Sequence, residues 1–174
     1  MGYDKRDLDN DIGNSFYNDE KYVEALPYYE KCLEEDTSYV SYYNLGTCHF
    51  QLKDYDKALE LLSVAESKED DEEVLGFISD IHFEREDYEK AMEYAEKALE
   101  LNRRNASRYD QRAKIYEKMG EEKEAINNYL TSISLYPQDC AIYKKLTALY
   151  NAIGDTAKAS EFEKKAKELM CEEE

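Results

Sequence analysis

The chain has 174 residues, enough for one compact domain or a short repeat array, and 42% of them are hydrophobic. Two prolines and six glycines are all that interrupt a sequence rich in Ala, Leu, Glu, Lys and Tyr, which predicts helix nearly throughout. The formal net charge of −18 opposes contact with phosphate backbones, so we expect no nucleic-acid partner. No apolar run approaches the roughly 20 residues that cross a bilayer, and no signal peptide opens the chain, which favours a cytoplasmic protein without a membrane partner.

An acidic decamer recurs along the chain at an even interval. KDYDKALELL (53–62) returns as EDYEKAMEYA (86–95), and further relatives begin at residues 20, 120 and 154. The sixth place of each decamer is an alanine, and these alanines are 33, 33, 34 and 34 residues apart: Ala25, Ala58, Ala91, Ala125 and Ala159. A second small residue follows each alanine seven places later: Cys32, Ala65, Ala98, Ser132 and Ala166. The recurrence predicts stacked repeats of one supersecondary unit.

Each repeat holds two amphipathic stretches, for example 72–85 and 88–101. Asp54, Asp87 and Asp155 stand at the breaks between the stretches, where a carboxylate can accept the orphan amides that open the second helix. Two helices that cross closely need small residues at the crossing, and we expect Gly46 to lie against Ala58 and Ala65 there.

The chain resembles five tandem tetratricopeptide repeats. The motif at the start of a repeat is best matched by YYNLGTCH (42–49) and the closing motif by LYP (135–137). After a lead-in of residues 1–5, the array covers 6–173, with repeats at 6–38, 39–71, 72–105, 106–139 and 140–173. The resemblance implies an all-α fold, a right-handed α-solenoid of five antiparallel helix pairs. Three residues depart from the family pattern: Asp9 replaces an aromatic residue, as an exposed first repeat would allow, and Arg112 and Glu163 replace apolar residues.

Nothing in the sequence indicates catalysis, a cofactor or a metal. Nucleotide-binding glycine loops and nucleophile motifs are absent, so we expect a protein that is not an enzyme. His49 and His82 occupy the same repeat position and are expected to replace tyrosine in the core instead of binding zinc. The four cysteines are scattered and are expected to be reduced, mostly buried thiols.

The resemblance implies that the first helix of each repeat lines a concave groove that holds a partner segment. In the first three repeats the matching positions carry mainly amides and aromatic rings, together with Thr47 and Asp80: Asn10, Asn14, Tyr17, Asn18, Tyr43, Asn44, Thr47, Phe50, Gln51, Asp80 and Phe83. Amides can donate to and accept from a peptide backbone, and rings offer area for anchor side chains. The alternative is that some of these rings only pack against a neighbouring repeat.

The fourth and fifth repeats carry lysines at the matching positions, Lys114, Lys118 and Lys144. This cluster would attract an acidic segment, but an i,i+4 pair of Asp110 with Lys114 explains part of it equally well. Family members that bind the acidic tails of heat-shock proteins use a clamp of lysines, asparagines and an arginine. Here the matching positions are Asn10, Asn14, Asn44, Glu73 and Phe77. Because every cation is missing, we expect no heat-shock tail in this groove.

The sequence therefore predicts a non-enzymatic scaffold or adaptor that binds a peptide segment of a partner protein in its concave groove. One alternative is a structural or assembly module that forms a weak homodimer through the last helix, 156–171, if Phe162, Ala166, Leu169 and Met170 leave an apolar strip open. A second alternative is an acidic chaperone like those of type III secretion, although five repeats exceed the usual three.

Overall fold

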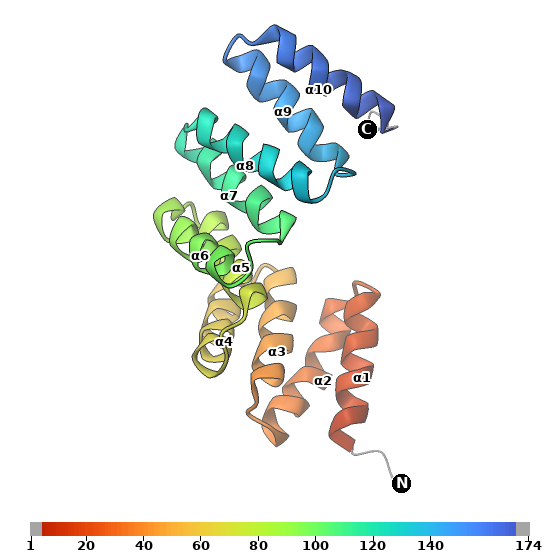
Figure 1. Ribbon diagram of the computed structural model, residues 1–174. Helices are drawn as coiled ribbons and strands as arrows, with labels where there is room; N and C mark the ends of the chain where they lie inside the picture. The colour runs from red at the N-terminus through yellow and green to blue at the C-terminus, as the bar shows by residue number, and fades with distance from the viewer. Residues whose placement is uncertain (1–4, 170–174) are drawn as a thin grey trace. The chain divides into compact units, whose positions relative to one another are not determined.

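The computed structural model describes the backbone of residues 5–169 and the side chains of residues 8–169. Within that part the chain is all-α, with ten helices and no strand (Figure 1). In chain order they are α1 (Lys5–Asn18), α2 (Tyr22–Glu35), α3 (Tyr39–Gln51), α4 (Tyr55–Lys68), α5 (Glu72–Glu84), α6 (Tyr88–Leu101), α7 (Ala106–Met119), α8 (Glu122–Leu135), α9 (Cys140–Ala152) and α10 (Thr156–Glu168). The two helices expected in each repeat are therefore confirmed.

The aspartates expected at the helix starts act as N-caps. Asp54 accepts from the backbone amide of Lys57, and Asp87 and Asp155 accept from the equivalent amides of α6 and α10. Each bond satisfies one of the amides that the first helical turn leaves without a partner. In these three repeats a local aspartate thus marks the start of the second helix, whereas Lys21 before α2 and Glu121 before α8 make no side-chain cap bond.

Each turn between the two helices of a repeat passes through one residue with positive φ. Glycine fills this place in the last two repeats, with φ of 78° at Gly120 and 81° at Gly154. In the first three repeats it is filled by residues with a side chain, Glu20, Lys53 and Glu86, at φ of 60° to 61°. Residues other than glycine pay a steric cost in this left-handed region, so the turn geometry is imposed by the packing of the helices it joins.

The chain divides into two compact units, residues 1–85 and 86–174. In the first unit α1 packs on α2 and α3 packs on α4, while α2 contacts α3 and α4 contacts α5. Its core includes Tyr29, Leu45, Cys48 and Leu61. Gly46 lies at the crossing of α3 with α4, where an added Cβ would stand 2.8 Å from Cγ of Leu62. The residue nearest to Gly46 is thus Leu62, which lies between Ala58 and Ala65 in the sequence, and not either of those alanines as expected. Both alanines are fully buried.

In the second unit α7 packs on α8 and α9 packs on α10, with α8 bridging to α9. The core is a cluster around Tyr129, Leu146 and Tyr150 that includes Phe162 and Ala166. The ring of Phe162 stacks on that of Tyr150 with 5.4 Å between centroids. The expectation that Phe162 and Ala166 leave an apolar strip open is wrong, because both are 6% exposed inside this core. Leu169 is half-buried against the same cluster, and Met170 lies outside the described residues.

The three residues that depart from the repeat pattern each have a charged or polar partner nearby. Asp9 is 8% exposed, so the expectation of an exposed position is wrong; one of its oxygens lies 4.0 Å from Nζ of Lys31 on α2. The half-buried Arg112 donates from Nε to Asn128 at 2.7 Å. Glu163 is exposed and forms an ion pair with Lys167. Asp9 and Arg112 thus bring polar groups into partly or fully buried positions, whereas Glu163 lies at the surface.

The histidines and cysteines follow the expectations in part. His82 is buried, whereas the ring nitrogen Nδ1 of His49 lies 3.1 Å from the carboxylate of Asp54. Cys32 and Cys48 are buried free thiols, as expected. Cys140 is disulfide-bonded, so the expectation of a reduced thiol is wrong there, and Cys171 lies outside the described residues.

Candidate functional site

Polar side chains join α1 to α3 along the face expected to bind a peptide. The amide of Asn44 donates to the side-chain oxygen of Asn10 at 2.8 Å, and Nε2 of Gln51 donates to the hydroxyl of Tyr17 at 3.2 Å. Asn14 accepts from the hydroxyl of the buried Tyr29 at 2.9 Å. These amides therefore hold neighbouring helices together while remaining partly exposed, and each keeps hydrogen-bonding groups beyond the bond described.

A continuous series of aromatic rings follows α3 and reaches α5 and the start of α4. The ring centroids of Tyr39 and Tyr43 are 5.8 Å apart, and Tyr43 meets Phe77 at 6.2 Å. Phe77 contacts Phe50 edge to face at 5.2 Å, and Phe50 contacts Tyr55 at 5.9 Å. We name these five residues the aromatic ladder. Each ring is half-buried, so the ladder combines a packed base with area that reaches solvent.

A carboxylate stands at each end of the aromatic ladder. The hydroxyl of Tyr39 donates to Oδ2 of Asp71 at 2.6 Å, and that of Tyr55 donates to Glu84 at 3.4 Å. Burial and then the bond to Asp71 raise the pKa of Tyr39, and burial and the charge of Glu84 raise the pKa of Tyr55. Both phenols therefore stay neutral donors at neutral pH. The two terminal rings are held in place by hydrogen bonds that are independent of ring packing.

The remaining residues expected in the groove have different environments. Asp80 and Phe83 on α5 are half-buried, and Asn18 at the end of α1 is exposed. Thr47 is 4% exposed and donates to the carbonyl of Asn44, so its hydroxyl is used inside α3.

Three members of the aromatic ladder were absent from the predicted site: Tyr39, Tyr55 and Phe77. The spacing of Tyr39 and Tyr43, four residues apart on one helix, was a usable signal for the first. Phe77 occupies a position that the sequence comparison with heat-shock clamps had already aligned with the groove. Tyr55 is the first residue of a second helix, and the repeat pattern gives no reason to place it on this face.

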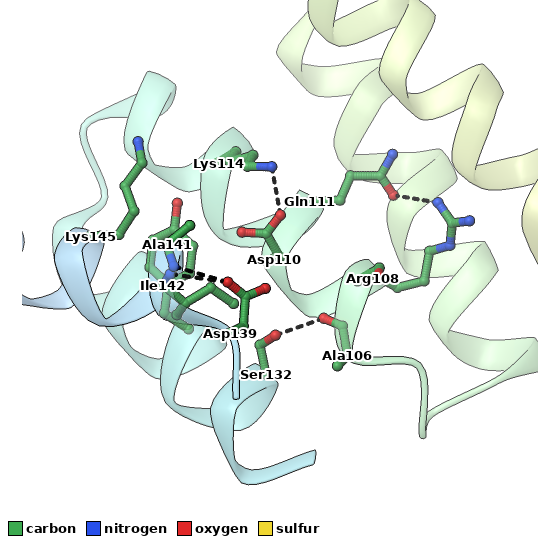
Figure 2. A network of polar contacts seen from close by, with 12 residues as sticks. Ala106, Arg108, Asp110, Gln111, Lys114, Ser132, Asp139, Ala141, Ile142 and Lys145 are labelled. Atoms are coloured by element: carbon green, nitrogen blue, oxygen red, sulfur yellow. Dashed lines mark hydrogen bonds and ion pairs between the residues drawn. The ribbon is translucent and has the colours of Figure 1, made fainter. Parts of the chain in front are cut away.

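The three lysines expected in the groove, Lys114, Lys118 and Lys144, lie on α7 and α9 in the second unit. Figure 2 shows Lys114 directed at Asp110, with Nζ 2.5 Å from the carboxylate, which confirms the i,i+4 pair. The neighbouring Lys145 is paired with Glu117 at 3.5 Å. Lys118 and Lys144 are exposed. Part of the positive charge on these helices is thus neutralised within the unit.

Two open depressions also lie in the second unit. One, of about 330 Å³, is lined by both signs of charge, including Glu96, Glu100, Arg103 and Arg112. The other, of about 590 Å³, lies beside the N-termini of α7 and α9, whose caps Asn105 and Asp139 are already bonded to backbone amides. The lining of the first depression is mainly charged, and that of the second is mainly polar apart from the exposed Leu135 and Tyr136. Neither lining contains a series of contacting rings like the aromatic ladder.

Paired helices, small residues at the crossings and a face of rings and amides are features of a protein-interaction scaffold built from helical repeats. Three family models described as tetratricopeptide repeat match residues 17–81, 72–105 and 106–139. The chain belongs to the tetratricopeptide repeat family.

Known proteins resemble the chain in sequence and in fold. A segment of 49 residues is 41% identical to the Hsp70-Hsp90 organising protein of Plasmodium falciparum (isolate 3D7); it covers 28% of this chain and 9% of that relative. Among solved structures, MamA 41-end from Desulfovibrio magneticus RS-1 has a TM-score of 0.84 at 19% identity, covering 98% of this chain and 97% of that one. Another MamA crystal structure has a TM-score of 0.81 at 24% identity, with 91% and 94% covered. These similarities confirm the tetratricopeptide solenoid as the fold class.

Among the described residues, no helix has the length and apolar character needed to span a bilayer.

Proposed function

We propose that the chain is a non-enzymatic scaffold that binds a peptide segment of a partner protein on the face that α3 shares with α1 and α5. The observation that carries this proposal is the aromatic ladder. Its rings hold one another in place, so the area they offer is already ordered before a ligand arrives. Preordered aromatic area is the kind of surface that supplies most of the binding energy at protein interfaces.

The amides of α1 and α3 complement the ladder. Asn10, Asn14 and Asn44 are half-buried on α1 and α3, and each has hydrogen-bonding groups left over after its bond to a neighbouring helix. An extended peptide needs such groups for its own backbone, since an amide or carbonyl buried without a partner costs about 1–3 kcal/mol. Rings that anchor side chains and amides that satisfy the backbone together suit a peptide better than a small metabolite.

A titration of peptides selected from a random library tests the proposal. We expect Tyr43→Ala to weaken every selected peptide by about tenfold or more, because truncating a central ring at an interface typically costs over 1 kcal/mol. Tyr28→Ala is the matched control: Tyr28 is a half-buried tyrosine on α2 that stacks on Phe16 at 5.6 Å, away from the ladder. Equal affinities for the two variants, with folding intact, would exclude the ladder as the binding face.

A further inference from the structure

The acidic residues of the chain are concentrated in the first unit, which contains the aromatic ladder. Residues 1–85 contain 22 Asp and Glu against 8 Lys and Arg, whereas residues 86–174 contain 19 against 15. Most of the net charge of −18 therefore belongs to the first unit. A ligand that approaches this unit enters a strongly negative field.

The helices that carry the ladder contribute to this imbalance directly. Neither α3 nor α5 contains a lysine or an arginine, and α5 contains four acidic residues: Glu72, Glu73, Asp80 and Glu84. The carboxylates at the ends of the ladder, Asp71 and Glu84, accept from tyrosine hydroxyls, which carry no positive charge. Their negative charges are therefore not neutralised by the bonds that orient the rings.

Two of the cations near the Tyr55 end of the ladder, Arg85 and Lys57, already have acidic partners. Nη2 of Arg85 lies 2.5 Å from Asp56, and Nζ of Lys57 lies 3.1 Å from Glu60. Elsewhere the chain places its own cations over tyrosine rings: Nζ of Lys31 is 5.2 Å from the ring centre of Tyr28, and that of Lys68 is 5.4 Å from Tyr42. Half-buried tyrosine faces in this protein thus accept ammonium groups.

From these observations we infer that the ladder face selects a basic peptide, one in which Lys or Arg side chains alternate with apolar or aromatic anchors. This inference rests on the proposed function. The apolar anchors pack on Phe50 and Phe77. The cations lie over the tyrosine rings and beside Asp80 and Glu84, where the negative ring faces and the carboxylates both attract positive charge. An acidic segment meets like charge at both ends of the ladder and is excluded.

Three short labelled peptides with the same Leu and Phe residues, and with Lys, Gln or Glu between them, test the inference on the full chain by fluorescence anisotropy. We expect the Lys peptide to bind roughly five- to tenfold more tightly than the Gln peptide, and the Glu peptide not to bind. The preference for Lys over Gln should shrink as NaCl is added, because salt screens the carboxylates.

A matched pair of variants separates the ladder from the general charge of the protein. Asp80→Asn with Glu84→Gln should remove most of the preference for the Lys peptide. Glu24→Gln with Glu34→Gln, which makes the same change in charge at exposed positions of α2, should leave that preference intact. If both double variants reduce Lys-peptide binding equally, the attraction belongs to the whole surface and the inference is overturned.

The outcomes also separate this inference from the proposed function. If Lys and Gln peptides bind equally and Tyr43→Ala weakens both, the ladder binds peptides but does not select basic ones, which overturns the inference alone. If Tyr43→Ala changes the affinity of none of the peptides, both the inference and the proposed binding face are overturned.

Discussion

The side chain of Asn10 on α1 and that of Asn44 on α3, which belong to neighbouring repeats, are hydrogen-bonded to each other at 2.8 Å. The bond fixes how α1 lies beside α3 and orients two amides on the face proposed to bind a peptide. Two residues expected in the peptide-binding groove therefore also join neighbouring repeats.

A double-mutant cycle on this pair should reveal the dual role. We expect Asn10→Ala and Asn44→Ala each to lower the free energy of unfolding by about 0.5–1.5 kcal/mol, the usual net value of a hydrogen bond. The double variant should cost less than the two single variants added, because the second change removes a group whose partner is already gone. Urea denaturation measures all three values, and strict additivity would show that the bond contributes nothing in solution.

The close approach of α3 to α4 makes Gly46 sensitive to a single methyl group. An added Cβ would lie 2.8 Å from Cγ of Leu62, so we expect Gly46→Ala to lower the free energy of unfolding by about 1–3 kcal/mol through overpacking. Combining it with Leu62→Ala should produce less destabilisation than the sum of the single changes, since the smaller side chain leaves room for the methyl group. Thermal unfolding of the four proteins checks this prediction, and a Gly46→Ala variant as stable as the parent would refute the close approach.

The left-handed turn residues predict a pair of opposite effects. Gly120 has φ of 78° and nothing within 4 Å of an added Cβ, so Gly120→Ala should cost about 1 kcal/mol from backbone strain alone. Lys53 has φ of 61°, and Lys53→Gly should stabilise the chain by about 0.5 kcal/mol, the strain relieved minus the added flexibility of the unfolded chain. Chemical denaturation gives both signs, and destabilisation by Lys53→Gly would mean that the side chain outweighs the backbone term.

The raised pKa values of a buried thiol and a buried phenol predict that the chain loses stability at alkaline pH. Burial, with a smaller effect of Glu30, raises the pKa of the Cys48 thiol to about 11, and burial followed by the bond to Glu117 raises the pKa of Tyr129. The folded chain then keeps protons that the unfolded chain releases, so the stabilisation is complete below about pH 9 and is lost as the pH rises through 11.

Melting temperatures measured between pH 7 and 11.5 test this expectation. The fall above pH 9 should be shallower in Tyr129→Phe, which has no phenol to ionise, than in the parent. A melting temperature that stays constant across the whole range would contradict the prediction.

The placement of the helices could be predicted from the sequence because the determining signals are local and repeated. Ala58 and Ala91 are fully buried, and Asp54 and Asp87 cap the helices that contain them, as their positions in the decamer indicate. Carboxylates at helix starts act within a few residues of the chain, and small side chains at crossings act between the two helices of one repeat, as with Gly46 and Leu62. The helix-pair assignment therefore needed no knowledge of long-range contacts.

The environment of individual side chains could not be predicted so well. Asp9 was expected on an exposed repeat but is buried beside α2, and Thr47 was expected on the groove but bonds within its own helix. The contact of Phe77 with Phe50 joins residues 27 positions apart and depends on how α5 is rotated against α3. A rotation of this kind is set by the whole packed interface, which a periodic pattern does not encode.

Asp71 connects the aromatic ladder to the stability of a helix. Its Oδ1 accepts the backbone amide of Glu73 at 2.7 Å, which caps α5, while its Oδ2 accepts the hydroxyl of Tyr39 at 2.6 Å. One carboxylate thus holds both a ring of the aromatic ladder and the first turn of the next helix. If a peptide binds the ladder as proposed, we expect hydrogen exchange at the Glu73 amide to change on binding, which would report the complex without a label on either molecule.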